Sequence, residues 1–255
     1  MNAAEETPSP DDRRMPFLGH LEELRWCLIR SIAFVAVCFC VCLVFVRQLL
    51  DLLKSPLTKA GIGLMDAPAQ LRTLSVGEAF TALFTIAGVA AVAVGLPYIL
   101  YEIWKFVSPG LKPSERRAIF PLLFFGTLFF YAGVFFTHKI LLPPTLGYFL
   151  KLNVDYGLAA EWRMMDYLSF TLTMMLASGV MAELPIVTVV LARFGIVSAP
   201  FLLHYWRHAI VVLLVLAAAL TPSTDATTMM LLAGPLFALY GISIILAKIF
   251  YVQRV

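Results

Sequence analysis

Six runs of apolar residues, separated by polar segments, form the main pattern of this 255-residue chain. A helix needs about 20 predominantly apolar residues to cross a hydrocarbon core about 30 Å thick, and all but the fifth run reach or approach that length. The pattern predicts an all-α polytopic membrane protein with six transmembrane helices. The runs are Leu28–Val46, Ala79–Tyr101, Ala118–Thr137, Tyr167–Ala192, Ala209–Leu220 and Ala226–Ala247.

The fifth run, Ala209–Leu220, has 12 residues, which span about 18 Å as a helix. So short a helix must thin the bilayer, lie beside water or recruit Leu202–His208 as an interfacial turn. Tyr205 and Trp206 suit such a turn because their rings favour the membrane interface. Prolines interrupt four other spans and are expected to kink them, which predicts a curved bundle; they are Pro97, Pro121, Pro185 and Pro235.

The distribution of basic residues predicts the orientation of the helices. With the N-terminus inside, 12 of the 19 Lys and Arg residues fall on the inner side and 7 on the outer side. Because cytoplasmic loops are enriched in these residues, both termini are predicted to be cytoplasmic. Residues 1–15 are predicted to be a disordered tail, 16–250 the membrane domain and 251–255 a short tail. The outer segments after the first and third spans have about 30 residues each and are expected to carry short surface helices.

Composition agrees with a membrane protein and argues against several other classes. Hydrophobic residues make up 61% of the chain and charged residues 14%, against about 45–50% and 25% in a soluble domain. The net charge of +3 is spread along the chain, which favours membrane lipid over nucleic acid as a partner. No phosphate-binding glycine loop occurs, the Ser, His and acidic residues are scattered, and the cysteines lack metal or disulfide spacing. We therefore predict no enzyme activity, no cofactor and no metal.

Glu183 is the only charged residue in the fourth run, Tyr167–Ala192. A carboxylate inside the membrane costs about 2.5–3.5 kcal/mol on insertion scales unless it faces protein or water, and intramembrane acids are functional by default. Pro185 frees the carbonyl of Met181 within a turn of this acid, so polar groups cluster there. We predict a functional polar contact at Glu183; the alternative is a protonated acid that hydrogen-bonds another helix.

The segment that enters the first span predicts a helix on the inner membrane surface. Apolar residues recur at helical spacing between Leu21 and Leu28. Glu22 has Arg25 as a partner three residues on, whereas Glu23 has no basic residue three or four positions on. Glu23 is therefore expected to be available to a binding partner; a solvated surface charge is the alternative interpretation.

A second acid lies on the same predicted side, between the second and third spans. Glu115 falls in the first turn of the helix that Pro113 begins, where the helix dipole favours an acid, so a structural role is one interpretation. Trp104 and Phe106 lie on the approach to this segment. Two carboxylates, Glu23 and Glu115, flanked by aromatic rings would bind paired guanidinium groups through forked, charge-assisted hydrogen bonds.

Several short motifs follow one another along the chain. They are His20-Leu21-x-Glu23-Leu24-Arg25, Ser55-Pro56-Leu57, Tyr101-x-x-Trp104-x-Phe106-x-x-Pro109-x-Leu111-x-x-x-Glu115-Arg116-Arg117, Glu183-Leu184-Pro185, Leu220-Thr221-Pro222 with Asp225, and Gly234-Pro235. Together they resemble the TatC family, the six-span, signal-reading subunit of the twin-arginine protein translocase. The resemblance covers residues 16 to about 250 in order.

The resemblance implies export of folded proteins across the cytoplasmic (inner) membrane of a bacterium, driven by the proton-motive force, by a homo-oligomer within a larger complex. It implies a site for the paired-arginine signal peptide, formed by Glu23, Arg25, Phe106 and Glu115. It implies that Glu183 faces the concave side and that single-span TatA/TatB-type subunits dock along spans five and six. Two further candidates map to outer loops: Pro56 and Asp225.

Two other functions are alternatives: a small proton-coupled carrier with Glu183 as the relay, and a passive structural subunit of a membrane complex. Carriers usually place several polar groups at mid-membrane within repeated halves. In this sequence one intramembrane acid stands alone and no repeat occurs. Replacing Glu115 separates the three, because a receptor loses signal-peptide crosslinking, a carrier keeps its flux and a scaffold loses assembly.

Overall fold

The computed structural model describes residues 17–61, 70–107, 119–158, 161–193, 195–220 and 226–250. Glu115 and Asp225, together with the predicted tails 1–15 and 251–255, lie outside the described residues. The helices and strands are α1 (Phe17–Val44), α2 (Val46–Gly61), β1 (Gln70–Arg72), α3 (Glu78–Val107), α5 (Ile119–Phe136), η2 (Thr137–Leu141), α6 (Leu142–Asp155), β2 (Glu161–Arg163), α7 (Met164–Met181), α8 (Leu184–Arg193), α9 (Ala199–His204), α10 (Trp206–Leu220) and α11 (Ala226–Phe250).

The membrane spans agree with the apolar runs. Among the described residues, five helical segments are long and apolar enough to cross a membrane: Gly19–Val44, Glu78–Val107, Phe120–Asp155, Met164–Arg193 and Ala226–Phe250. The helix at the position of the fifth apolar run, α10, is shorter: it has 15 residues, or a length of about 22 Å. This confirms the polytopic helical fold and the shortness of the apolar helix at the fifth position. The chain turns at Tyr205, between α9 and α10, where the sequence predicts an interfacial turn.

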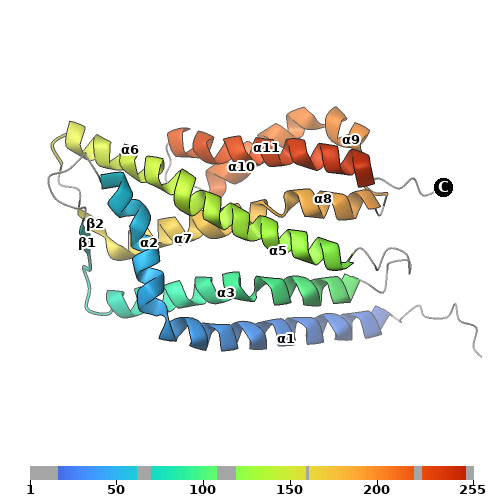
Figure 1. The fold of residues 1–255 in the computed structure, drawn as a ribbon, viewed down its shortest axis with the longest axis horizontal. Helices are drawn as coiled ribbons and strands as arrows, with labels where there is room; N and C mark the ends of the chain where they lie inside the picture. Colours follow the sequence, from blue (N-terminus) through green and yellow to red (C-terminus); the bar gives the residue numbers. More distant parts are fainter. Residues whose placement is uncertain are drawn as a thin grey trace, which may run out of the picture.

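The helices lie side by side in a row (Figure 1). α1 packs against α3, α3 against α5 and α7, and α8 against α11, which also contacts α10. The start of α1 and the end of α11 lie at the same end of the bundle, which we call the terminal end (Figure 1). The strands β1 and β2 lie at the opposite end, which we call the sheet end. An even number of crossings places the two ends of the described chain together in this way.

The all-α fold is confirmed, and it carries one small sheet that the sequence does not predict. β1 and β2 form a two-stranded parallel sheet in which Leu71 lies opposite Trp162. An ion pair crosses the strands, with Arg72 Nη2 2.6 Å from Glu161 Oε1, and both side chains are about half exposed. Strands of three residues are too short to show an alternating pattern, so the sequence gives no signal for them.

A buried carboxylate fastens this sheet to the start of α3. The side chain of Glu78 is 2% exposed, and its Oε1 accepts hydrogen bonds from Arg163 Nε at 3.0 Å and from the Met165 amide at 3.2 Å. Its Oε2 accepts from the amides of Leu74 at 2.8 Å and Ser75 at 3.3 Å. One acid thus accepts bonds from the end of β2 and from the segments that follow both strands, so that the buried charge is paired and hydrogen-bonded.

The third span is longer than its apolar run predicts. α5 continues through the π-helix η2 into α6, so Phe120–Asp155 forms one apolar helical segment of 36 residues. Pro143 and Pro144 lie at the start of α6, directly after η2, and the helix continues through them. The short surface helix expected after this span is therefore an extension of it. The other short helix expected in an outer segment, α2, is a separate element.

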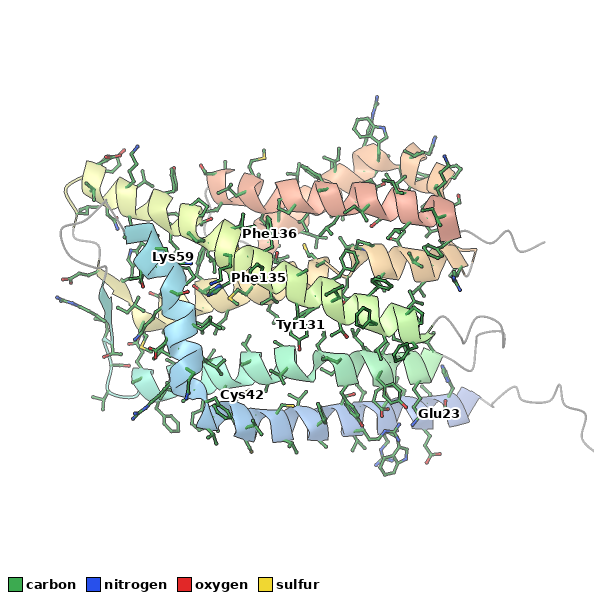
Figure 2. All side chains as sticks on the ribbon, viewed as in Figure 1. Glu23, Cys42, Lys59, Tyr131, Phe135 and Phe136 are labelled. Atoms are coloured by element: carbon green, nitrogen blue, oxygen red, sulfur yellow. The ribbon has the colours of Figure 1, made fainter. Side chains whose placement is uncertain are left out.

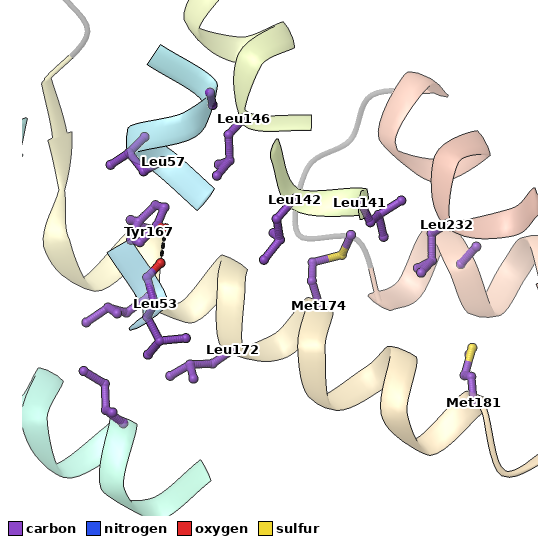
Figure 3. Packing of buried hydrophobic residues seen from close by; sticks show 14 of the residues in the cluster. Leu53, Leu57, Leu141, Leu142, Leu146, Tyr167, Leu172, Met174, Met181 and Leu232 are labelled. Atoms are coloured by element: carbon purple, nitrogen blue, oxygen red, sulfur yellow. Dashed lines mark hydrogen bonds between the residues drawn. The ribbon is translucent and has the colours of Figure 1, made fainter. Parts of the chain in front are cut away.

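The hydrophobic core joins α2, α6 and α7 near the sheet end, where buried leucines surround Tyr167 (Figure 3). Further along, α5 crosses α7 at very short range. A Cβ built on Gly133 of α5 would lie 2.6 Å from Ser178 O, and one built on Gly179 of α7 would lie 2.7 Å from the fully buried Phe130 ring. Small residues at such crossings let helix backbones approach closely inside a membrane.

Candidate functional site

Glu23, His20 and Phe106 form a cluster at the terminal end, which we call the Glu23 cluster. Glu23 lies near the start of α1 (Figure 2). His20 Nδ1 lies 3.7 Å from Glu23 Oε2, and the His20 ring stacks on Phe106 of α3 with centroids 4.2 Å apart and an interplanar angle of 11°. The Glu23 side chain is 40% exposed, whereas its Oε2 is buried and accepts no hydrogen bond from a described residue. A ligand that approaches over the exposed part of the side chain would give this oxygen a donor.

The structure brings some of the predicted signal-site residues together and leaves others apart. Glu23 and Phe106, on different helices, meet through His20, which the sequence presents only as part of a motif. The ion pairs of the described residues include Glu23 with His20 and not the expected pair of Glu22 with Arg25. His20 lies three residues before Glu23, so a count of basic residues at later positions only does not include it. Arg25 is exposed.

A partly buried ion pair that sequence reasoning missed lies about two turns further along α1. Arg30 Nη2 lies 2.9 Å from Glu102 Oε2, and Arg30 Nε donates to the same oxygen at 3.1 Å. Tyr98, one turn before Glu102 on α3, donates its hydroxyl to Glu102 Oε1 at 3.2 Å. The Glu102 side chain is 3% exposed. The four-residue spacing of the tyrosine and the acid was the available signal, and the network fixes α1 on α3 beside the Glu23 cluster.

Glu183 lies at a break in the fourth span and lines a cavity of about 290 Å³. α7 ends at Met181 and α8 begins at Leu184, so the break falls where Pro185 predicts one. The other residues that line this cavity are apolar or aromatic and come from α3, α5 and α8. They include Leu100, Trp104, Leu122, Ile186 and Val190.

The Glu183 carboxylate lacks a hydrogen-bond partner within the described chain. Gly126 of α5 leaves room for it, since a Cβ at position 126 would lie 3.0 Å from Glu183 Oε2. Glu183 Oε1 is buried and makes no hydrogen bond with a described residue, and the same is true of the Thr127 hydroxyl on α5. The alternative interpretation requires a hydrogen bond from Glu183 to another helix of the chain, and no described residue makes that bond. A buried polar atom without a partner costs free energy, so this cavity favours a polar group from another molecule.

Pro56 of α2 frees a backbone carbonyl that another element binds. Proline has no N–H, so the carbonyl of Leu52, four residues earlier, lacks its donor within the helix. His138 of η2 takes this place, with its Nε2 2.9 Å from Leu52 O, and its side chain is almost fully buried. Tyr167 of α7 donates its hydroxyl to the next carbonyl, that of Leu53. Two carbonyls thus fasten α2 to the third and fourth spans.

The cysteines contribute to packing between α1 and α3. All four are free, and Cys38 and Cys42 pack with Ala87 and Ala91 of α3, whereas Cys40 is exposed. Within the described ranges, no group of three or more His, Cys, Asp or Glu side chains could hold a metal ion.

Comparisons with known proteins extend over nearly the whole chain. The family model described as Sec-independent protein translocase protein (TatC) matches residues 19–235. A TatC protein of Deinococcus radiodurans is 35% identical over 244 residues, which cover 95% of this chain and 89% of that relative. One from Synechocystis is 37% identical, with 91% and 87% covered. The chloroplastic TATC of Oryza sativa is 35% identical over 91% of this chain, which spans only 62% of that longer relative.

The fold is also that of a solved structure. A crystal structure described as the twin-arginine translocase receptor TatC matches with a TM-score of 0.79 and 34% sequence identity, covering 90% of this chain and 98% of that chain. Sequence and fold therefore agree that the chain belongs to the TatC family of Sec-independent protein translocase proteins, polytopic helical membrane proteins of protein transport.

Proposed function

We propose that this protein is the receptor subunit of a bacterial twin-arginine translocase. It binds the paired-arginine signal peptide of folded cargo proteins. Together with single-span TatA/TatB-type subunits, in a homo-oligomeric complex, it exports them across the cytoplasmic membrane using the proton-motive force. The observation that carries the receptor role is the Glu23 cluster, in which a half-exposed carboxylate and an aromatic ring lie together at one end of the bundle. We propose no catalytic activity.

The chemistry of the Glu23 cluster suits an arginine side chain. His20 approaches Glu23 at 3.7 Å, which is longer than a hydrogen bond and leaves the carboxylate open to a better donor. A guanidinium group binds a carboxylate through two parallel hydrogen bonds and also stacks on aromatic faces. A lysine ammonium has neither the forked geometry nor the planar face for these contacts. We propose that the first signal arginine binds Glu23 beside Phe106 and that Glu115 receives the second.

Calorimetry with a paired-arginine peptide tests the signal site. Glu23→Gln is expected to weaken binding at least tenfold, whereas Glu22→Gln, a matched change at the neighbouring exposed position, should leave it within twofold. Glu115→Ala is expected to cost about 2–5 kcal/mol, as when one partner of a desolvated charge pair is removed. A paired-lysine peptide should bind the unmodified protein weakly and respond little to either change. Equal losses for Glu22→Gln and Glu23→Gln would refute the site.

We propose that the Glu183 cavity receives a helix of a single-span partner. An apolar cavity with one acid suits an apolar helix that brings a single hydrogen-bonding side chain, because that side chain would satisfy the buried Oε1. The partner helix would run along α8 toward the short α10 and α11. Pro56 would have a structural role away from this cavity, because it leaves the Leu52 carbonyl free for the bond to His138 that holds α2 in place.

Crosslinking from the cavity tests the partner site. A photoreactive residue at Val187, which lines the cavity and is 50% exposed, should crosslink to the single-span partners. Glu183→Gln should reduce those crosslinks and leave signal-peptide binding unchanged. Thr188→Val is the control, since among the described residues the Thr188 hydroxyl bonds only the Leu184 carbonyl of its own helix. Loss of signal binding in Glu183→Gln would contradict the separation of the two sites.

The proposed orientation places the terminal end in the cytoplasm. In a cysteine-free background, Tyr156→Cys, which is 77% exposed at the sheet end, should react with an impermeant thiol reagent in intact cells. Leu21→Cys, which is 45% exposed near the start of α1, should react only after the membrane is opened. The reverse pattern would place the Glu23 cluster outside and exclude the receptor function.

A further inference from the structure

A cleft of about 600 Å³ opens between α6 and α7 at the sheet end, away from both sites described above. Its volume lies within the range typical of small-molecule sites. One face of each helix forms a wall, because the lining residues on each recur at helical spacing. The wall residues are Leu146, Phe149 and Asn153 on α6, and Asp166, Tyr167 and Phe170 on α7.

The cleft is polar at its outer end and apolar further in. α6 runs toward the sheet end and α7 runs away from it (Figure 1), so Asn153 near the end of α6 and Asp166 near the start of α7 both lie at the outer end. Leu146 lies two turns deeper and Phe170 one turn deeper. The rings of Phe149 and Phe170 meet edge to face across the cleft, with centroids 6.2 Å apart. The lining therefore changes from polar to apolar along the axes of α6 and α7.

The charges at the outer end favour a ligand with both signs of charge. Glu161 is already paired with Arg72. Arg163 uses its Nε toward Glu78 and keeps 43% of its side chain exposed. Asp166 is exposed and forms no ion pair with a described residue. One carboxylate and one partly engaged guanidinium thus face the same cleft.

We propose that this cleft binds the head group of a zwitterionic phospholipid that carries a primary amine. The ammonium group binds Asp166 and the amide oxygen of Asn153, the phosphate binds the exposed part of the Arg163 guanidinium, and the acyl region lies along Phe149 and Phe170. An anionic lipid brings no cation for the aspartate. The aromatic lining also suits a lipid head group with an amine, because aromatic rings favour the membrane interface and attract ammonium groups.

Lipid quenching of Trp162, which lines the cleft, tests this proposal. The other three tryptophans are replaced by Phe, leaving Trp162 as the fluorophore of the full chain in mixed micelles. Phospholipids with brominated acyl chains and ethanolamine, choline or glycerol head groups are then compared. The ethanolamine lipid should reach half-maximal quenching at a mole fraction at least fivefold lower than the glycerol lipid and threefold lower than the choline lipid. Equal quenching by all three lipids would overturn the proposal.

Variants at position 166 separate head-group recognition from a structural effect. Asp166→Asn should abolish the ethanolamine preference, and Asp166→Glu, which keeps the charge, should retain it. Asp155→Asn removes an exposed aspartate at the same end of the bundle but outside the cleft, so it should change nothing. The proposal would also be overturned if the ethanolamine lipid were still preferred in Asp166→Asn. It would likewise be overturned if signal or partner peptides relieved the Trp162 quenching by lipids of every head group.

Discussion

Gly133 is the position where one added methyl group should most disturb the contact between α5 and α7. A Cβ there would lie 2.6 Å from Ser178 O and 2.8 Å from Ala182 Cβ. The carbonyl oxygen belongs to the backbone and the Ala182 Cβ is fixed to it, so neither can rotate away. Gly133→Ala must therefore push the two helices apart. Ala182 precedes Glu183 directly, so the displacement reaches the Glu183 cavity as well.

The magnitude follows from two opposing contributions. Overpacking a close contact costs about 1–3 kcal/mol, and a clash against backbone belongs at the upper end of that range. Replacing a helical glycine by alanine gains at most about 1 kcal/mol in conformational entropy. The net expectation is a loss of about 2 kcal/mol. Gly88 of α3 is the matched control, since its Cβ would have one neighbour within 4 Å, Phe39 Cε2 at 3.9 Å, so Gly88→Ala should gain up to about 1 kcal/mol.

Thermal unfolding of the purified protein in detergent measures both changes. For a chain of this size, about 2–4 °C of melting temperature corresponds to 1 kcal/mol. Gly133→Ala should therefore lower the melting temperature by about 4–8 °C, whereas Gly88→Ala should raise it or leave it unchanged. Shifts of the same sign and size in the two variants would refute the close approach of α5 to α7.

Three further predictions concern polar contacts. Glu78→Gln should raise the rate of amide hydrogen exchange around β1 and β2 at least tenfold, because it disturbs the four hydrogen bonds that Glu78 accepts. Glu161→Gln, which changes a half-exposed ion pair, should alter that rate less than threefold. Equal effects of the two variants in hydrogen-exchange mass spectrometry would be inconsistent with this prediction. His138→Leu should lower the free energy of unfolding by about 1–3 kcal/mol. The loss should be smaller in a Pro56→Ala background, because the new N–H of Ala at position 56 can donate to the Leu52 carbonyl. Additive losses in this double-mutant cycle would argue against the prediction. Glu102→Gln should weaken signal binding severalfold by loosening α1 from α3, and unchanged calorimetry would exclude that role.

The sequence predicts the spans well because a bilayer demands long apolar segments, and this demand is visible residue by residue. The short α10 and the break beside Pro185 could be predicted for the same reason. The pairing of β1 with β2 could not, since these strands are three residues long and about 90 positions apart. The π-helix that joins α5 to α6 likewise has no local pattern.

The candidate sites show the same limit. Counting crossings places Glu23 and Phe106 at one end of the bundle, and an isolated acid in an apolar run identifies Glu183. The sequence does not reveal that His20 lies between the first two, because this depends on a ring of α1 meeting a ring of α3. Nor does it reveal that Arg30 reaches Glu102, which lies 72 positions later in the chain.

The bond between His138 and the Leu52 carbonyl has a consequence for how mutational scans of such proteins should be interpreted. The accepting atom belongs to the main chain, so exchanging the leucine side chain leaves the acceptor unchanged. The residue that keeps this carbonyl available is Pro56, because proline has no N–H that could compete with His138 for it. A scan would therefore report position 56 as sensitive and position 52 as tolerant, although the interaction is made at the latter.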